Sequence, residues 1–209
     1  YKREPNKDVT FDFFKYQNIQ IKNKINYCTG NQFIDYNKLD FQNIIPFIKM
    51  FFEPSEMIKT VSSDLIKKYN VCPENCIAVY YRGTDKKIET PIASFQTFYE
   101  KLVSIQKNSD IQILLQTDSA HFLDFMKPKN LKNVIIINEL VTSHTMNGVH
   151  LEHAYAFNYE QMKYFLATIL IIAQCKHIIT GSGNVSEWIM FYRGHANGVF
   201  QFLNDKWIN

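Results

Sequence analysis

The chain has 209 residues, a length that allows one full domain and a smaller lobe. Its formal net charge is only +3, and its basic residues form no dense run, so nucleic acid is not an expected partner. No apolar stretch reaches the roughly 20 residues of a transmembrane helix, and no signal peptide is visible. We expect an excised domain without a membrane segment. The sequence does not fix the cellular compartment, and of the two we favour the cytoplasm over the secretory lumen.

Residues 1–72 are predicted to form a partial N-terminal lobe of irregular strands and helices. Weak strand signals lie at Thr10–Phe14 and Ile19–Ile21, and a short helix with an internal proline is expected at Phe41–Phe52. A clearer helix begins near Ser55, because its apolar residues recur on one face at helical spacing. Asn70 marks its end.

Residues 73–209 alternate apolar strands with helices, which predicts a parallel sheet with right-handed crossovers. Helices are expected after Ser94 and over His121–Met126, Tyr159–Gln174 and Asn184–Tyr192, and strands are expected over Cys76–Tyr81, Ile111–Leu115, Val134–Ile137, His177–Thr180 and Val199–Leu203. The fold class is thus α/β, with a Rossmann-like domain at 73–209. Such sheets bind ligands outside the carboxyl ends of their strands, so loops 82–93, 116–119, 138–157 and 181–184 are the expected functional regions.

The first polar strand end carries Arg82. Arg3, Arg82 and Arg193 are the chain's arginines among 23 basic residues, so an arginine here is expected to serve for its planar fork. At a strand end that fork can grip two phosphate oxygens. The structural alternative is a turn bridge between Arg82 and Asp85.

Two further strand ends are polar. The segment Gly181-Ser182-Gly183-Asn184-Val185 opens a helix, and its glycines and free amides suit an anion. Taken by itself, the segment is better explained as a tight turn from strand to helix. In Gln116-Thr117-Asp118-Ser119, the aspartate can orient Arg82, contact a nucleotide or cap the next helix.

Histidines and cysteines give weaker signals. His144, His150 and His153 lie in or beside the long loop 138–157, and no spacing supports a metal site, so we expect substrate-loop or surface histidines and no metal. Cys72 and Cys76 flank three residues and allow a local disulfide, with reduced thiols the preferred alternative.

The three strand ends together resemble a known family. VYYRGTDK resembles the H-x-R-R-x-D-K motif of the α1,6-fucosyltransferases, which include NodZ-type enzymes and have O-fucosyltransferase relatives. LLQTDS and HIITGSGNVSEWIM resemble the second and third motifs in the same order. The resemblance spans about residues 40–200. It implies the donor-binding half of a GT-B-like glycosyltransferase that uses GDP-fucose, inverts the anomeric centre and needs neither metal nor cofactor.

The resemblance also implies residue roles. Arg82 matches the essential arginine on the donor pyrophosphate, Asp85 falls on a catalytic motif position, and Glu89 lies where the family carries a candidate base. His144 is the second candidate base, and His150 belongs to the substrate loop. Donor contacts are implied for Tyr80, Gly83, Asp118, Gly181, Ser182, Gly183, Asn184 and Val185.

Three positions depart from the family pattern. Tyr80 replaces the motif histidine, Gly83 replaces the second arginine, and Thr168 stands where an acidic residue is usual. The leading hypothesis is transfer of fucose from GDP-fucose to a glycan or protein hydroxyl. A non-catalytic nucleotide- or glycan-binding module and a transferase of another nucleotide sugar remain as alternatives.

Overall fold

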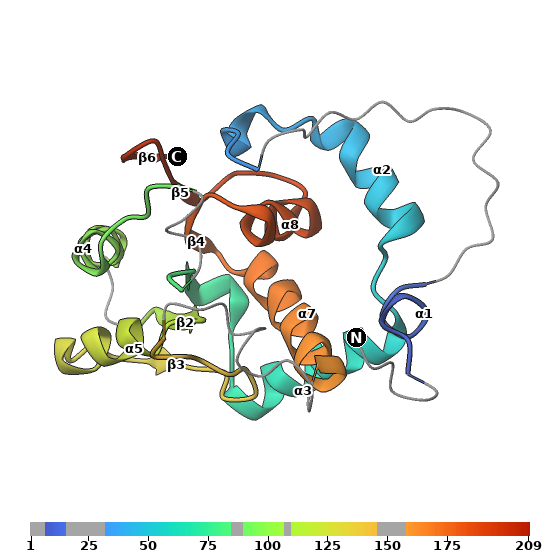
Figure 1. Cartoon of the computed structure of the whole chain (residues 1–209), viewed down its shortest axis with the longest axis horizontal. Coiled ribbons are helices and arrows are strands. Elements are labelled where there is room, and N and C mark those ends of the chain that lie inside the picture. Colours follow the sequence, from blue (N-terminus) through green and yellow to red (C-terminus); the bar gives the residue numbers. More distant parts are fainter. Residues whose placement is uncertain (1–6, 16–31, 85–89, 107–109, 146–157) are drawn as a thin grey trace.

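The computed structural model describes residues 7–15, 32–84, 90–106, 110–145 and 158–209 (Figure 1). Asp85, Glu89, His150, His153 and the expected strand at Ile19–Ile21 lie outside these ranges. None of the helices within them is both long and apolar enough to cross a bilayer.

The elements alternate along the chain much as expected. The helices are α1 (Val9–Phe13), α2 (Phe41–Phe51), α3 (Glu56–Tyr69), α4 (Phe95–Ile105), α5 (Ala120–Met126), α7 (Asn158–Gln174) and α8 (Asn184–Arg193). The short 3-10 helices are η1 (Tyr36–Lys38), η2 (Pro73–Asn75) and η4 (Lys127–Lys129). The strands are β1 (Cys76–Tyr81), β2 (Gln112–Thr117), β3 (Val134–Ile135), β4 (His177–Gly181), β5 (Val199–Leu203) and β6 (Lys206–Ile208).

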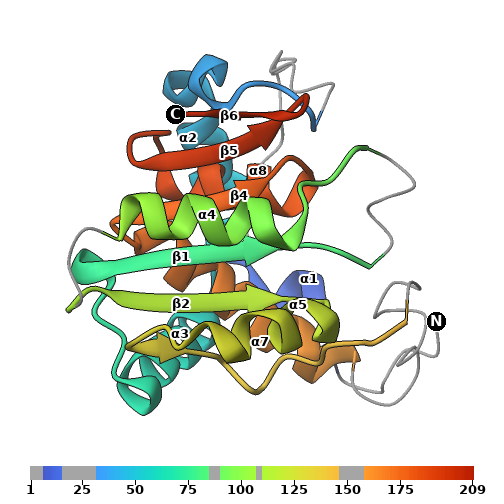
Figure 2. The same cartoon turned by 90° about the vertical axis from the view of Figure 1, so that its left-hand side faces the viewer.

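The strands form one sheet in the order β3-β2-β1-β4-β5-β6 (Figure 2). The first five strands are parallel, and β6 pairs with β5 in the antiparallel sense. The predicted α/β class and its parallel, Rossmann-like sheet are therefore confirmed. The added strand β6 was not predicted; it follows a turn in which Asn204 and Asp205 both have positive φ, the backbone that a tight hairpin requires.

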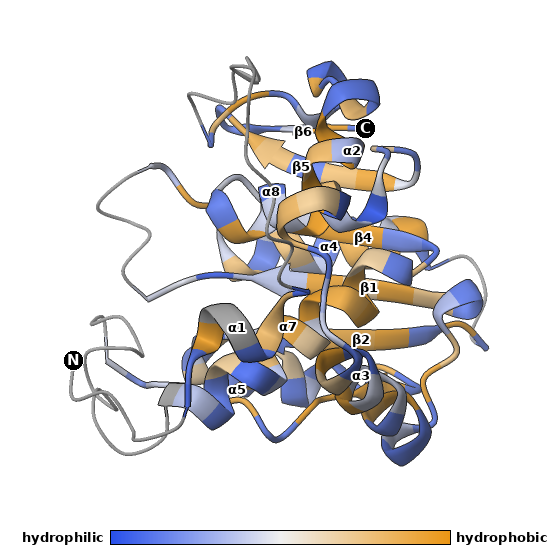
Figure 3. Cartoon of the chain, turned by 90° about the vertical axis from the view of Figure 1, so that its right-hand side faces the viewer, coloured by the Kyte–Doolittle hydropathy of each residue, from blue (hydrophilic) through white to orange (hydrophobic). Residues whose placement is uncertain are grey.

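Helices cover both faces of the sheet. Along β1 the side chains alternate, and Ile77 and Val79 pack on the side of α4 and α5, whereas Ala78 packs on the side of α7 and α8 (Figures 1 and 2). Every residue of β1 is buried, as expected for a central parallel strand. Figure 3 shows that β1 and β2 consist mostly of hydrophobic residues, as burial on both faces of the sheet requires.

Helices α2 and α3 pack on the same side as α7 and α8. Buried residues of this early region, Ile44, Ile48 and Leu65 among them, belong to one core cluster with Ala78 of β1 and Ile171 of α7. These helices thus share a core with the sheet. The expected division of the chain between residues 72 and 73 stays a prediction.

Local capping signals fix the helix ends. Ser55 and Ser94 accept hydrogen bonds from the amides of Ile58 and Thr97 and so cap α3 and α4, as predicted for such positions. Asn70 ends α3 in the left-handed conformation with φ of 49°.

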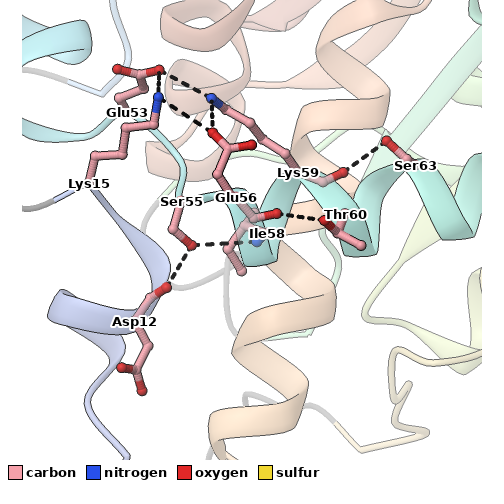
Figure 4. A network of polar contacts seen from close by, with 9 residues as sticks. All are labelled: Asp12, Lys15, Glu53, Ser55, Glu56, Ile58, Lys59, Thr60 and Ser63. Carbon is pink, nitrogen blue, oxygen red and sulfur yellow. Dashed lines mark hydrogen bonds and ion pairs between the residues drawn. The ribbon is translucent and has the colours of Figure 1, made fainter.

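The strand expected at Thr10–Phe14 is wrong, because most of this segment forms α1. Val9 and Phe13 are four residues apart, a helical spacing, and Phe13 is buried in a cluster with Ile58 and Leu166. The helix is fixed to the start of α3, since the Ser55 hydroxyl donates to the Asp12 carbonyl over 2.6 Å (Figure 4). Beside it, Lys15 and Lys59 form ion pairs with Glu53 and Glu56 (Figure 4).

Candidate functional site

The sheet has its topological switch point between β1 and β4. The connections after β1 and β2 run through α4 and α5 on one face of the sheet, and α7 and α8 cover the other face (Figure 1). The chain that leaves β1 therefore crosses one face, and the chain that leaves β4 crosses the opposite face. Ligands of open α/β sheets bind at this point, outside the carboxyl ends of the strands. The three polar strand ends singled out in the sequence all lie on this edge.

A pocket lies at the switch point. Its walls come from the ends of β1 and β4, the start of α8 and the residues before α4: Tyr80–Arg82, Thr90–Ala93, Phe98, Gly181–Ser186 and Phe202. The described residues enclose about 30 Å³, room for a water molecule or two rather than for a nucleotide.

Arg82 stands at the edge of this pocket beside Asp118. Its side chain is 33% exposed, and its Nε atom lies 3.7 Å from Oδ2 of the aspartate. The two residues meet because Tyr81 of β1 is in register with Thr117 of β2, which puts the next residues side by side. A partly exposed pair at this distance contributes little stability, so its main consequence is to orient the guanidinium.

Asp118 also holds the turn that follows β1. Its Oδ1 accepts from the Gly83 amide and its Oδ2 from the Thr84 hydroxyl, both over 2.8 Å. The helix-capping alternative for Asp118 is wrong, because Ser119 caps α5 by accepting from the Phe122 amide. Asp118 thus orders the loop that carries Arg82, and a direct donor contact stays a prediction.

Position 83 holds a glycine, and the structure gives a steric reason for it. A Cβ atom at this position would come within 2.4 Å of Cε1 of Tyr81. The Tyr81 ring cannot easily move, because it stacks on Phe122 at a centroid distance of 4.3 Å and its hydroxyl donates to the Ala93 carbonyl. Any side chain at residue 83 would displace this buried ring.

The amides at the start of α8 are already hydrogen-bonded. The Gly183 amide donates to the Tyr36 hydroxyl over 3.2 Å, and the Asn184 amide donates to Oε1 of Gln32 over 3.0 Å. The expected anion site at this turn therefore has an N-terminal segment lying on it. Burial strongly raises the pKa of Tyr36, so its hydroxyl stays protonated.

Gln201 of β5 fixes that N-terminal segment in place. Its Oε1 accepts from the Tyr36 amide, and its Nε2 donates to the Ile34 carbonyl and to the Ser182 hydroxyl, each over 2.9 Å. Ser182 in turn donates to the Phe202 carbonyl. Gln201 is a polar residue inside an apolar strand and is almost fully buried, a signal that the sequence analysis did not use.

Of the other residues predicted to contact the sugar donor, some lie at the mouth of the pocket and others in the protein core. Gly181 faces open space, since a Cβ there would meet nothing within 4 Å, and Val185 lines the pocket. Tyr80 also lines the pocket but is largely buried in the core. Thr168 lies inside α7 with only 1% of its surface exposed, so a nucleotide cannot reach it in this structure.

Glu187 is a buried carboxyl that the sequence analysis missed. It sits in the first turn of α8 with 6% of its surface exposed, and its Oε1 has no hydrogen-bond partner among the described residues. Burial raises the pKa of this group to about 7. This carboxyl is therefore about half protonated at pH 7, and it lies in the first turn of the helix that follows the candidate anion turn.

His144 lies on the outer side of α5 and does not appear among the described residues that line the pocket. Its Nε2 lies 3.1 Å from Oδ2 of Asp124, and its carbonyl oxygen lies 2.8 Å from Nε2 of His121. The role of His144 as a base stays a prediction. Asp85, Glu89 and His150 fall outside the described residues.

Arg193 binds backbone carbonyls, and the described cysteines are free thiols. The Arg193 fork donates to the carbonyls of Ala173, Cys175, Lys176 and Asn197, at the end of α8 away from the pocket. Cys72 and Cys76 are free thiols, so the local disulfide is not formed. Cys76 is buried in β1, whereas Cys72 is exposed.

Comparison with known proteins places fucosyltransferases among the structural neighbours. No protein-family model and no curated protein matches the sequence. The structure is similar to NodZ α1,6-fucosyltransferase co-crystallised with GDP (16% identity, TM-score 0.49, 75% of this chain and 48% of that one) and to NodZ from Bradyrhizobium (15%, 0.49, 75% and 47%). A mutant of Arabidopsis thaliana FUT1 in complex with GDP is similar at 11% identity and a TM-score of 0.44, over 80% of this chain and 37% of that one.

The match thus spans about half the length of the two NodZ structures and 37% of the length of FUT1. The neighbours are of the kind that the sequence motifs lead us to expect. At these identities and TM-scores, the likeness concerns the outline of the fold and assigns neither an activity nor a ligand to this chain.

Proposed function

We propose that this chain is the nucleotide-sugar-binding half of a glycosyltransferase that transfers fucose from GDP-fucose to a glycan or protein hydroxyl. The observation that carries the proposal is the position of Arg82, the partly exposed arginine at the β1 end of the switch-point pocket. Its guanidinium is oriented by Asp118 at 3.7 Å and faces the same mouth as the glycine turn at Gly181–Ser186. The order of the three motifs along the chain supports the family.

The proposed reaction is a single in-line displacement at the anomeric carbon, with inversion and without a metal. Negative charge grows on the β-phosphate as the bond from its oxygen to the sugar breaks, and Arg82 would stabilise that charge through two parallel hydrogen bonds. The acceptor hydroxyl loses its proton to a base, for which Glu89 is proposed from the family motif. Asp85 is proposed to support the same loop.

Binding of the pyrophosphate at the α8 turn requires a rearrangement. Gln32 must leave the Asn184 amide before a phosphate oxygen can accept from it, whereas the Gly183 amide is held by the more deeply buried Tyr36. The Arg82 side chain is 33% exposed, so part of its guanidinium can meet a phosphate while Asp118 stays beside Nε. The proposal therefore assigns one phosphate contact to Arg82 and another to the freed Asn184 amide.

The test is calorimetric titration in the presence of a chelator, with GDP, GDP-fucose, UDP and UDP-sugars as ligands. Selective binding of GDP and GDP-fucose is expected. Arg82→Ala should weaken it by about 10- to 100-fold, the effect of losing a charge-assisted contact, and Arg82→Lys should restore only part of it. Lys38→Ala, which changes an exposed basic residue of the N-terminal segment, is the matched control and should bind normally.

Equal affinity of wild type and Arg82→Ala would remove the pyrophosphate contact that we assign. Selectivity for UDP would keep a nucleotide site and discard the donor. Turnover of GDP-fucose to GDP, measured with and without candidate glycan acceptors, distinguishes a transferase from a binding module.

A non-catalytic nucleotide-binding module is the second candidate. It is favoured by the small enclosed volume of the pocket and by the N-terminal segment on the α8 amides. This candidate predicts GDP binding without any hydrolysis or transfer of the sugar.

A further inference from the structure

Three side chains of types that can ligate metals lie close together on the solvent-exposed side of α5. Within the described part of the chain, His121, Asp124 and His144 each offer one ligand atom, and these atoms lie within 4.8 Å of one another. His121 and Asp124 are three residues apart on α5 and therefore face the same way. His144 comes from the segment after β3, 20 positions after Asp124.

The backbone fixes the position of His144 relative to α5. Ser143 forms a parallel bridge with Ser119, in which the Ser143 amide donates to the Asp118 carbonyl and the Ala120 amide donates to the Ser143 carbonyl. These bonds, at 2.9 and 2.8 Å, tie the segment before His144 to the first turn of the helix. The three ligands are thus brought together by hydrogen bonds that do not depend on a metal.

The side chains are already close to a coordinating arrangement. Nε2 of His144 lies 3.1 Å from Oδ2 of Asp124, and the rings of His144 and His121 lie edge to face with centroids 5.0 Å apart. Zinc ligands stand about 2.0–2.2 Å from the ion, so two ligand atoms of one site are about 3.3 Å apart. All three side chains are exposed, so small rotations bring them to that spacing without disturbing the core.

We propose that His121, Asp124 and His144 form a binding site for a divalent transition cation of the zinc type. Two imidazoles and one carboxylate suit such an ion better than magnesium or calcium, which prefer oxygen ligands. The ion links α5 to the segment after β3. None of the three residues is among the described residues that line the switch-point pocket, and the proposed sugar transfer does not use the ion.

Lys127 competes with a cation at this site. Its ammonium group lies 2.7 Å from Oδ1 of Asp124, the carboxylate oxygen that does not face His144. Because both groups are exposed, this pair is weak and does not prevent binding. Its removal should nevertheless favour the cation, and this gives the test a variant with an effect of opposite sign.

The experiment is a titration of chelator-treated, folded protein with Zn²⁺, followed by calorimetry, and with Co²⁺, followed by its visible absorption. One ion per chain is expected, with a tetrahedral or five-coordinate Co²⁺ spectrum. His121→Ala, Asp124→Asn and His144→Ala should each weaken binding by about tenfold or more, at least the loss seen when a supporting partner is removed. Lys127→Ala should tighten it by roughly threefold.

The matched controls are His195→Ala and Asp64→Asn, which change an exposed histidine and an exposed carboxylate elsewhere. Both should bind as the wild type does. Binding that persists in the three ligand variants would place the ion on other residues, and wild-type protein that binds neither ion in the micromolar range would also overturn the proposal. Thermal unfolding in chelator checks that each variant is folded before it is titrated.

Discussion

The carboxylate of Asp118 accepts a hydrogen bond from the Gly83 amide over 2.8 Å, which joins the ends of β2 and β1 at the candidate site. The same carboxylate accepts from the Thr84 hydroxyl and lies beside Arg82. A single acidic residue therefore sets both the path of the loop after β1 and the direction of the arginine fork. This arrangement limits the directions in which the partly exposed arginine side chain can point.

Asp118→Asn should separate these two roles. The amide keeps one acceptor oxygen for Gly83 but loses the charge beside Arg82, so we expect the free energy of unfolding to fall by about 1–2 kcal/mol. The affinity for GDP should fall by roughly tenfold, since a fork without its orienting partner loses more freedom on binding. Chemical denaturation and calorimetry measure the two effects, with Asp64→Asn as control. A loss of stability alone, with unchanged GDP affinity, would make Asp118 a purely structural residue.

Gly83→Ala should destabilise the protein through the Tyr81 ring. The new methyl group meets Cε1 at 2.4 Å, and displacing a packed ring costs about 1–3 kcal/mol. Gly181→Ala is the matched control, because its methyl group meets nothing and should change the free energy of unfolding by less than about 0.5 kcal/mol.

A double-mutant cycle identifies the cause of this loss. In a Tyr81→Leu background the methyl group of Gly83→Ala has no ring to displace, so its cost should largely vanish. The same cost in both backgrounds would point to the backbone of residue 83 instead of the ring.

Gln32→Ala should raise the affinity for GDP. The substitution removes the side chain that accepts from the Asn184 amide and leaves that donor for a phosphate oxygen. Because the lost interaction is a neutral hydrogen bond at an exposed site, we expect a gain of about three- to tenfold. Gln96→Ala, on the exposed surface of α4, is the control. Weaker binding after Gln32→Ala would instead show that Gln32 itself contacts the ligand.

Glu187 should make stability depend on pH. Its folded-state pKa of about 7 exceeds the ordinary value of 4.5, so the folded protein holds this proton where the unfolded chain has released it. The contribution to stability is fully present below pH 4.5 and is lost as the pH rises to 7. The expected loss from this group is about 2–3 kcal/mol.

Glu187→Gln should remove this dependence. The variant is expected to match the wild type near pH 5 and to exceed its free energy of unfolding by about 2 kcal/mol near pH 8. Denaturant titrations at the two pH values measure the difference, with Glu100→Gln on exposed α4 as control. Parallel stability profiles for Glu187→Gln and wild type would show that another group titrates in this range.

The sequence by itself determined the elements and the edge on which function is expected. Strand β1 and strand β5 lie where the apolar runs predicted them, and Ser94 and Asn70 cap and end their helices, because hydrophobic period and capping are local properties. Parallel strands bring their carboxyl ends to one side, so the sequence alone groups Arg82, Asp118 and the glycine turn.

Only the tertiary structure decided which groups meet at that edge. Strand order made Asp118 the described partner of Arg82, and the ring of Tyr81 explains the glycine at position 83. Tyr36 reaches Gly183 across 147 positions of sequence. Such contacts depend on how whole layers pack against each other, and no local pattern of charge, period or capping encodes that distance.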